Sequence, residues 1–110
     1  MTDFHGIMPA IVTPIDERER FRPEAFAKLT ERLYAAGVYG LYVCGQTGEG
    51  LQQSVEQRKE VADAAVRLSP RGKTVIIHVG AHSTADALEL SRHASQAGAH
   101  AIKEEAKTAI

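Results

Sequence analysis

The strongest constraint on this chain is the alternation of short apolar runs with segments of helical period. The apolar runs cover residues 7–13, 39–44 and 74–79, and a shorter one covers residues 99–102. Near-continuous apolar runs of this length are typical of strands that are covered on both faces, as in parallel sheets. We therefore predict strands at these four places.

Amphipathic segments with helix start and stop signals separate these runs. The first begins at Pro23, a preferred first-turn residue, and the second opens at Ser54 with Gln57 three residues later, which is a capping-box pattern. The third runs over residues 84–97 and stops before Gly98. The apolar residues at three- and four-residue steps, which we expect to face the core, are Phe26, Leu29, Leu33 and Ala36, then Val61, Ala62, Ala65 and Leu68, then Ala87, Leu90, Ala94 and Ala97. The predicted order β-α-β-α-β-α-β is that of consecutive βαβ units.

Composition excludes several classes of protein. Thirteen Lys and Arg against fourteen Asp and Glu leave no basic excess for binding nucleic acid. No apolar run approaches the ~20 residues of a membrane helix, and the N-terminus lacks a signal-peptide layout. The single cysteine, Cys44, fits a reducing compartment. We expect one domain, located in the cytoplasm, with neither a nucleic acid nor a membrane as partner.

Two α/β architectures remain open for this pattern. Right-handed crossovers between neighbouring parallel strands place every helix on one side of the sheet, which leaves the other face bare. A (β/α)8 barrel encloses that face but needs about 200 residues or more, and this chain has 110. A doubly wound sheet covers both faces, and 110 residues is near the minimum for it. The chain is either a small two-sided domain or part of a barrel.

The glycine-rich segment 45–50, Gly-Gln-Thr-Gly-Glu-Gly, follows the second predicted strand. Its glycines permit close backbone approach, so that several N–H groups are able to point into one concavity and bind a phosphate or a carboxylate. The other interpretation is a tight strand-to-helix turn without a ligand. The spacing is not that of a dinucleotide-binding loop, and no P-loop lysine follows.

This loop resembles the G-[ST]-T-G-E signature of the pyruvate-dependent class I aldolases, the family of N-acetylneuraminate lyase and dihydrodipicolinate synthase. Further similar segments, in the same order, are Ala-Ile-Val-Thr-Pro at 10–14, Ser-Val-Glu-Gln-Arg at 54–58 and Ala-Gly-Ala at 97–99. Segments 48–55 and 77–81 are more similar to the neuraminate lyase branch. The resemblance implies a partial (β/α)8 TIM barrel, about the first three and a half βα units, as the N-terminal part of one aldolase domain spanning residues 1–110.

The resemblance also implies a site. Family members join pyruvate to a lysine as a Schiff base and need no cofactor, and their loop hydroxyls and amides hold the pyruvate carboxylate. In this chain Thr47 matches the second hydroxyl position, Gln46 replaces the first, and Gly48 contributes backbone. The substrate-binding residues expected here are Gln46, Thr47 and Gly48.

The candidate for the lysine is Lys103. Ile102-Lys103-Glu104 resembles the family's sixth-strand motif, in which the lysine follows an apolar strand residue. Two interpretations stay open: Lys103 is that catalytic lysine, brought forward by an internal deletion or splice, or residues 103–110 are a non-native tail. A Schiff-base lysine must be unprotonated to attack a ketone.

The function implied is cleavage of a 2-oxo acid sugar, similar to N-acetylneuraminate, to pyruvate and an aldehyde, with the 110-residue chain itself catalytically incomplete. One alternative is a synthase-like condensation of pyruvate with an aldehyde. Another is a non-catalytic fragment that folds by self-association, and a homo-oligomer is expected in any of these cases. No metal is expected, because the histidines lack ligand partners at a recognised spacing.

Overall fold

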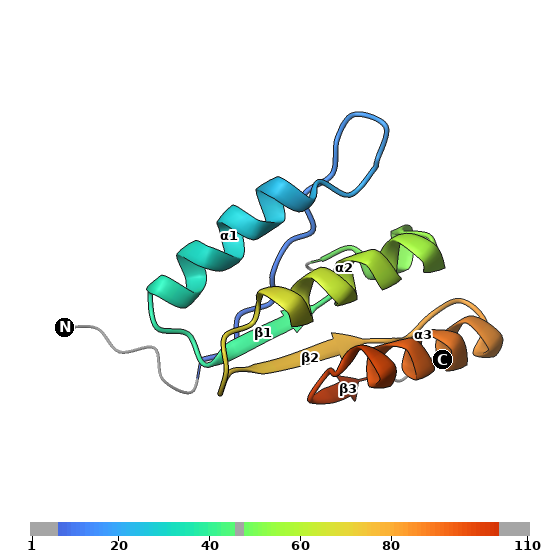
Figure 1. Cartoon of the computed structure of the whole chain (residues 1–110). Coiled ribbons are helices and arrows are strands. Elements are labelled where there is room, and N and C mark those ends of the chain that lie inside the picture. The colour runs from blue at the N-terminus through green and yellow to red at the C-terminus, as the bar shows by residue number, and fades with distance from the viewer. Residues whose placement is uncertain (1–6, 46–47, 104–110) are drawn as a thin grey trace.

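The computed structural model describes residues 7–45 and 48–103, and the element order follows the predicted alternation (Figure 1). The elements are α1 (Pro23–Ala35), β1 (Gly40–Val43), the short 3₁₀ helix η1 (Gly50–Gln52), α2 (Val55–Leu68), β2 (Thr74–His78), α3 (Thr84–Ala97) and β3 (Ala101–Lys103). The three strands form one parallel sheet in the order β1-β2-β3. The strands predicted at 39–44 and 74–79 and all three helices are confirmed.

Local capping explains why the helices begin and end as predicted. The Ser54 hydroxyl accepts the Gln57 N–H, and Ser83 accepts the Asp86 N–H, each at 3.1 Å. Gly98 ends α3 with a φ of 100°, in the left-handed region that glycine adopts without strain. The reciprocal half of the capping box is absent among these contacts, because the Gln57 side chain instead accepts from the Phe21 N–H.

The predicted strand at 7–13 is wrong as a regular strand. The segment is extended and lies beside β1, but it makes a single parallel bridge, between Ala10 and Tyr42. The Ile11 N–H donates to the Tyr42 carbonyl, and the Tyr42 N–H donates to the Pro9 carbonyl. The next bond toward the N-terminus would need an N–H from Pro9, which proline lacks. In the other direction Cys44, with a φ of 63°, turns the chain away from the ladder.

The last predicted strand is displaced toward the C-terminus. We expected residues 99–102, whereas β3 covers Ala101–Lys103 and pairs with β2 from Ile76↔Ala101 to His78↔Lys103. His100 explains the later start. Its N–H donates to the Val75 carbonyl, and its Nδ1 accepts the Val75 N–H at 3.1 Å. A side-chain nitrogen thus replaces the backbone carbonyl that would extend the ladder.

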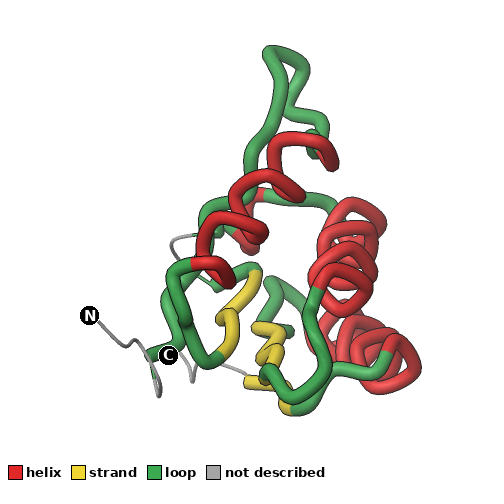
Figure 2. Tube along the Cα trace, turned by 60° about the vertical axis from the view of Figure 1, so that its left-hand side comes forward, coloured by secondary structure: helices red, strands yellow, loops and turns green. Residues whose placement is uncertain are grey.

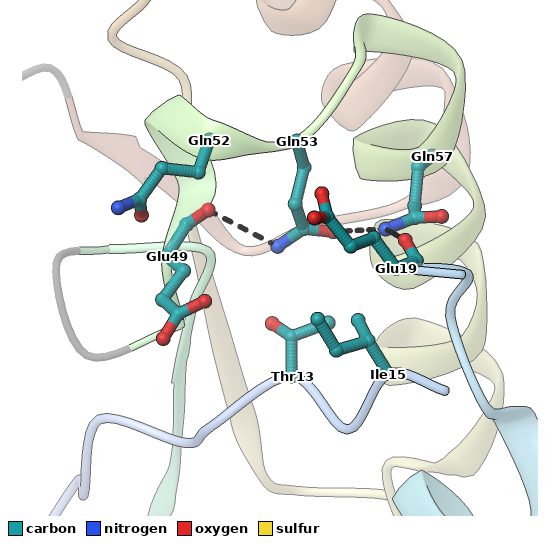
Figure 3. A pocket seen from close by; sticks show the side chains of 7 residues that line it. All are labelled: Thr13, Ile15, Glu19, Glu49, Gln52, Gln53 and Gln57. Atoms are coloured by element: carbon teal, nitrogen blue, oxygen red, sulfur yellow. Dashed lines mark hydrogen bonds between the residues drawn. The ribbon is translucent and has the colours of Figure 1, made fainter. Parts of the chain in front are cut away.

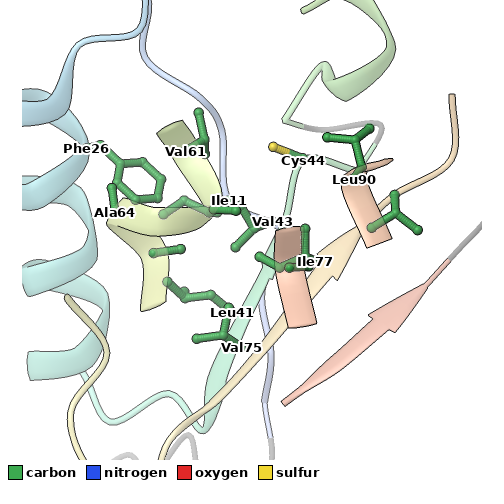
Figure 4. Close-up of a cluster of buried hydrophobic side chains, with 14 of the residues drawn as sticks. Ile11, Phe26, Leu41, Val43, Cys44, Val61, Ala64, Val75, Ile77 and Leu90 are labelled. Atoms are coloured by element: carbon green, nitrogen blue, oxygen red, sulfur yellow. The ribbon is translucent and has the colours of Figure 1, made fainter. Parts of the chain in front are cut away.

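The helices lie on one side of the sheet (Figure 2). The strand residues that face them are fully or almost fully buried, and they pack with Ile11 and with apolar residues of the helices (Figure 4): Leu41, Val43, Val75 and Ile77 meet Phe26, Val61, Ala64 and Leu90. Tyr42 and Ile76 alternate with them on the other face and are half-buried. No described helix covers that face, so the one-sided arrangement expected for part of a barrel is the one observed, and a two-sided doubly wound domain is not.

Within the described residues, no helix combines the length and the apolar character that crossing a bilayer requires.

Candidate functional site

The carboxyl ends of the parallel strands meet at one edge of the sheet, together with the segments that follow them. This edge carries the loop after β1 and the turn after β2, and Lys103 lies there in register with His78. Among the predicted site residues, Gly48 and Lys103 fall within the described residues. Gln46 and Thr47 lie outside them. The strand-end location is where α/β proteins bind their ligands.

Three hydrogen bonds, each to a different partner, fix residues 48–50, the returning half of the loop. The Gly50 N–H donates to the Gly45 carbonyl at 3.1 Å and closes the loop across its base. The Gly48 carbonyl accepts both from the Thr13 hydroxyl and from the Gln53 side-chain amide, each at 2.8 Å. The orientation of the Gly48 peptide is therefore set by the segment before α1 and by the approach to α2.

The glycines of the loop are required by close backbone contact. A Cβ on Gly50 would lie 2.0 Å from the Cys44 carbonyl oxygen, and one on Gly48 would lie 3.0 Å from the Ile11 carbonyl oxygen. A Cβ on Gly45 would lie 2.7 Å from the ring of Tyr42. The sequence indicated close backbone approach at this loop, and the contacts confirm it for Gly48 and Gly50, whereas the neighbour of Gly45 is a side chain.

Arg58 is a site residue that the sequence interpretation missed. It lies in the first turns of α2 and is only 3% exposed. Its Nη1 donates to the Gly80 carbonyl at 2.8 Å, and its Nη2 donates to the His78 carbonyl at 2.9 Å. Burial lowers the pKa of Arg58, yet arginine stays charged in proteins. A signal was available: Arg58 stands three and four residues before Val61 and Ala62, on the same helical face as the buried stripe.

Cys44 is the residue that directly follows β1, at the start of the loop. It is 1% exposed, and burial raises the pKa of its thiol to about 11, an effect that the nearby Arg58 guanidinium only partly opposes. A thiol held protonated at neutral pH is a poor nucleophile. This environment indicates that Cys44 serves packing.

Two aromatic rings meet near the carboxyl ends of β1 and β2, on the face of the sheet opposite the helices. The rings of Tyr42 and His78 meet edge to face, with centroids 6.3 Å apart and planes at 87°. The His78 side chain is 6% exposed. In the described part of the chain, no group of three or more His, Cys, Asp or Glu side chains is arranged to hold a metal ion.

A polar cavity adjoins the loop on the side of α1 (Figure 3). Its volume is about 260 Å³, and its lining consists of Thr13, Ile15, Glu19, Glu49, Gln52, Gln53 and Gln57. The Gln57 amide donates to the Glu19 carbonyl at 3.2 Å and to the Gln53 side chain at 3.1 Å, as the dashed lines show. These bonds tie the segment before α1 to the loop that follows β1.

The fold and the strand-edge loop define an α/β protein of the kind in which parallel strands carry a ligand site at their carboxyl ends. Residues 3–104 match the Dihydrodipicolinate synthetase family. The chain belongs to that family, as the sequence resemblance indicated.

Relatives from both branches of the family are similar to the chain. An N-acetylneuraminate lyase of Mediterraneibacter gnavus is 38% identical over 99 residues, covering 90% of this chain and 31% of its own length. A 4-hydroxy-tetrahydrodipicolinate synthase of Phenylobacterium zucineum is 39% identical over 98 residues, covering 89% of this chain and 33% of its own length. The chain thus spans about a third of the length of these relatives.

Solved structures agree with the described fold. The N-acetylneuraminate lyase of Aliivibrio salmonicida superposes with a TM-score of 0.86 at 38% identity, over 94% of this chain and 35% of that one. The dihydrodipicolinate synthase of Aquifex aeolicus superposes with a TM-score of 0.83 at 31% identity, over 92% of this chain and 34% of that one. The homologues are thus pyruvate-dependent lyases and aldolases of an α/β fold.

Proposed function

We propose that this chain is the N-terminal part, about three and a half βα units, of a Schiff-base-forming lyase that cleaves a 2-oxo acid sugar to pyruvate and an aldehyde. The observation that carries the proposal is the loop after β1, because its backbone is locked at Gly48 and Gly50 at the carboxyl edge of the sheet. A loop whose backbone is already fixed binds a carboxylate without a further entropic cost of ordering at the moment of binding.

The loop's proposed task is to hold the pyruvate carboxylate. Thr47 would donate its hydroxyl, Gln46 and Gly48 would donate backbone N–H groups, and the Gln46 side chain would contact the rest of the substrate. The Gly48 carbonyl is held by Thr13 and Gln53, which fixes the backbone directly after these donors, including the N–H direction of Glu49. The 2-oxo group then lies toward the strand ends.

Lys103 is the proposed Schiff-base residue. In the cleavage direction its amine would attack C2 of the 2-oxo acid sugar with loss of water. The resulting iminium would take up the electron pair of the breaking carbon–carbon bond while the neighbouring hydroxyl loses its proton and leaves as the aldehyde, and the remaining enamine would be protonated and hydrolysed to pyruvate and free lysine. Its position in β3, in register with His78, supports the assignment because that end of the sheet also carries the loop. The alternative proposal is that residues 103–110 are a non-native or spliced tail, of which residues 104–110 lie outside the described residues.

A 2-oxo acid sugar is preferred over a small aldehyde acceptor as the substrate. The solved neuraminate lyase matches at 38% identity and the solved synthase at 31%, with the chain covered almost equally. The curated relatives of the two branches are similar to the chain to the same degree, at 38% and 39%. The preference therefore depends on the solved structures and on the segments quoted above.

Borohydride trapping tests the proposed chemistry. Incubation of the chain with pyruvate and borohydride should add the mass of one reduced pyruvate, with the adduct on Lys103 after proteolysis and mass spectrometry. Lys103→Arg should abolish the adduct, and Lys28→Gln, which removes an exposed lysine of α1, should retain it. Folded wild-type protein without an adduct would contradict Lys103 as the reactive lysine and would favour the non-catalytic fragment.

We also propose that the chain self-associates. The face of β1 and β2 opposite the helices carries Tyr42 and Ile76, both half-buried, and no described helix covers it. Light scattering after size exclusion should give more than one copy per particle, and a cooperatively melting single copy at low concentration would contradict the proposal.

A further inference from the structure

Arg58 is a buried cation without a carboxylate at ion-pair distance in the part of the chain that the structure describes. Moving a charge out of water costs several kcal/mol unless hydrogen bonds and partner charges compensate for it. Two backbone carbonyls accept from its terminal nitrogens, and within the described residues Nε has no acceptor. A residue kept at this cost in the core invites a functional explanation.

The contacts of Arg58 join the exits of two neighbouring strands. On one side the guanidinium holds the carbonyls of His78 and Gly80, which lie at the end of β2 and in the turn after it. On the other side its Nη2 lies 3.4 Å from the place of a Cβ on Gly50, and it is close enough to Cys44 to affect the thiol electrostatically. One side chain of α2 therefore bonds to the end of β2 and the turn after it, and lies beside the loop after β1.

The guanidinium of Arg58 places a buried positive charge at the carboxyl edge of the sheet. Carbonyl oxygens offset a guanidinium only through their dipoles, and the Cys44 thiol is neutral at pH 7. Asp86 is the acidic group that acts on Arg58 through space, and no salt bridge joins the two. A positive charge shielded from water exerts a stronger field on a nearby anion than an exposed one does.

We propose that Arg58 is a positioning residue for a 2-oxo acid: it fixes the returning half of the loop after β1 against the turn after β2, and its charge favours a carboxylate at that edge. This inference rests on the proposed function for the identity of the ligand, but the fixing of the loop does not. Arg58 acts through the backbone it holds and through its field.

Two variants separate the hydrogen bonds from the charge. Arg58→Lys keeps the charge and loses the two-pronged contact with His78 and Gly80, whereas Arg58→Gln loses the charge as well. Arg67→Gln is the matched control, because Arg67 is an exposed arginine of the same helix. All four proteins are measured as the full 110-residue chain, after circular dichroism has shown them folded, by amide exchange at Gly50 and by NMR titration with pyruvate.

The expected result has two parts. Exchange of the Gly50 amide should be about tenfold faster in both Arg58 variants than in wild type and in Arg67→Gln, because its bond to Gly45 loses its support. The dissociation constant for pyruvate should rise about tenfold in Arg58→Gln and about threefold in Arg58→Lys. Should Arg58→Gln not fold, Arg58→Lys alone still decides the exchange measurement.

Three outcomes have distinct meanings. Unchanged Gly50 exchange in both variants overturns the positioning role, and equal weakening of pyruvate binding in Lys and Gln variants overturns the role of the charge. A wild-type chain that binds no pyruvate overturns the proposed function, and the exchange measurement then still decides whether Arg58 holds the loop.

Discussion

Gly50→Ala is the sharpest test of the packing that builds the loop. The added Cβ would lie 2.0 Å from the Cys44 carbonyl oxygen and 3.0 Å from its carbon. Distances below 3.0 Å are essentially not tolerated, so the two backbone segments must separate by about 1 Å. Overpacking costs about 1–3 kcal/mol, and the upper end applies because backbone stands on both sides. Because the φ of Gly50 is not positive, alanine also stabilises the protein by about 0.5–1 kcal/mol, since it lowers the conformational entropy of the unfolded chain.

The net expectation is a loss of about 2 kcal/mol in the free energy of unfolding. With a urea dependence of about 1–2 kcal/mol per molar for a chain of this size, the unfolding midpoint should fall by about 1–2 M. Circular dichroism in urea measures this, and amide NMR shifts of Gly45 and Gly48 report whether the change is centred on the loop.

Gly72→Ala is the control, because its Cβ would find no atom within 4 Å although its φ is 89°. It should lose about 1 kcal/mol from backbone conformation alone and leave the shifts of the loop unchanged. A Gly50→Ala protein with the wild-type midpoint and unchanged loop shifts would refute the argument, because the contact with Cys44 would then not constrain the loop.

Three further predictions concern groups outside the loop backbone. Burial raises the pKa of the Cys44 thiol to about 11, so the unfolded chain releases that proton at a lower pH than the folded chain does. The free energy of unfolding should therefore fall above pH 9, by up to about 1.4 kcal/mol per pH unit from this group. A disulfide reagent at pH 8 should modify Cys44 only at the rate of unfolding. The hydrogen bond and charge of Lys59 lower the pKa of Glu89, so this pair stabilises the fold above the ordinary glutamate pKa and ceases to do so as the pH falls through the lowered value. In an NMR titration, Lys59→Gln should return the Glu89 pKa toward its ordinary value. His100→Ala should lose about 1 kcal/mol because the Val75 N–H loses its acceptor, and His100→Asn, whose side-chain oxygen also accepts, should recover most of it in the same urea assay.

The elements that the sequence predicted well are those determined by neighbouring residues. Ser54 and Ser83 cap their helices through an N–H three residues away, and Gly98 ends a helix through its own φ. The strands at 39–44 and 74–79 were recognisable because they are short apolar runs rich in β-branched and aromatic residues. Such features need no knowledge of what lies elsewhere in the chain.

The features that the sequence did not reveal depend on the identity of a distant partner. The segment at 7–13 has the composition of a strand, but Pro9 faces β1 where an N–H is needed, and only the register shows this. Arg58 looked like an ordinary charged residue of a helix, because the carbonyls that accept from it are those of His78 and Gly80, in another part of the fold. The candidate loop was recognised by its residue types, whereas the hydrogen bonds that close it and fix the Gly48 carbonyl were not predicted.

The same separation in sequence explains why the loop should form only together with the core. The bond from Thr13 to Gly48 spans 35 residues, the bond from Phe21 to Gln57 spans 36, and the bond from Arg58 to Gly80 spans 22. The second and third of these contacts need α2 in place, because Gln57 and Arg58 lie in that helix. Closing chains of this length is entropically costly, and only the burial of the core compensates for it. The loop is therefore stabilised by tertiary packing as well as by its local hydrogen bonds, so we expect substitutions in the core of α2 to weaken the candidate site even where they touch none of its residues.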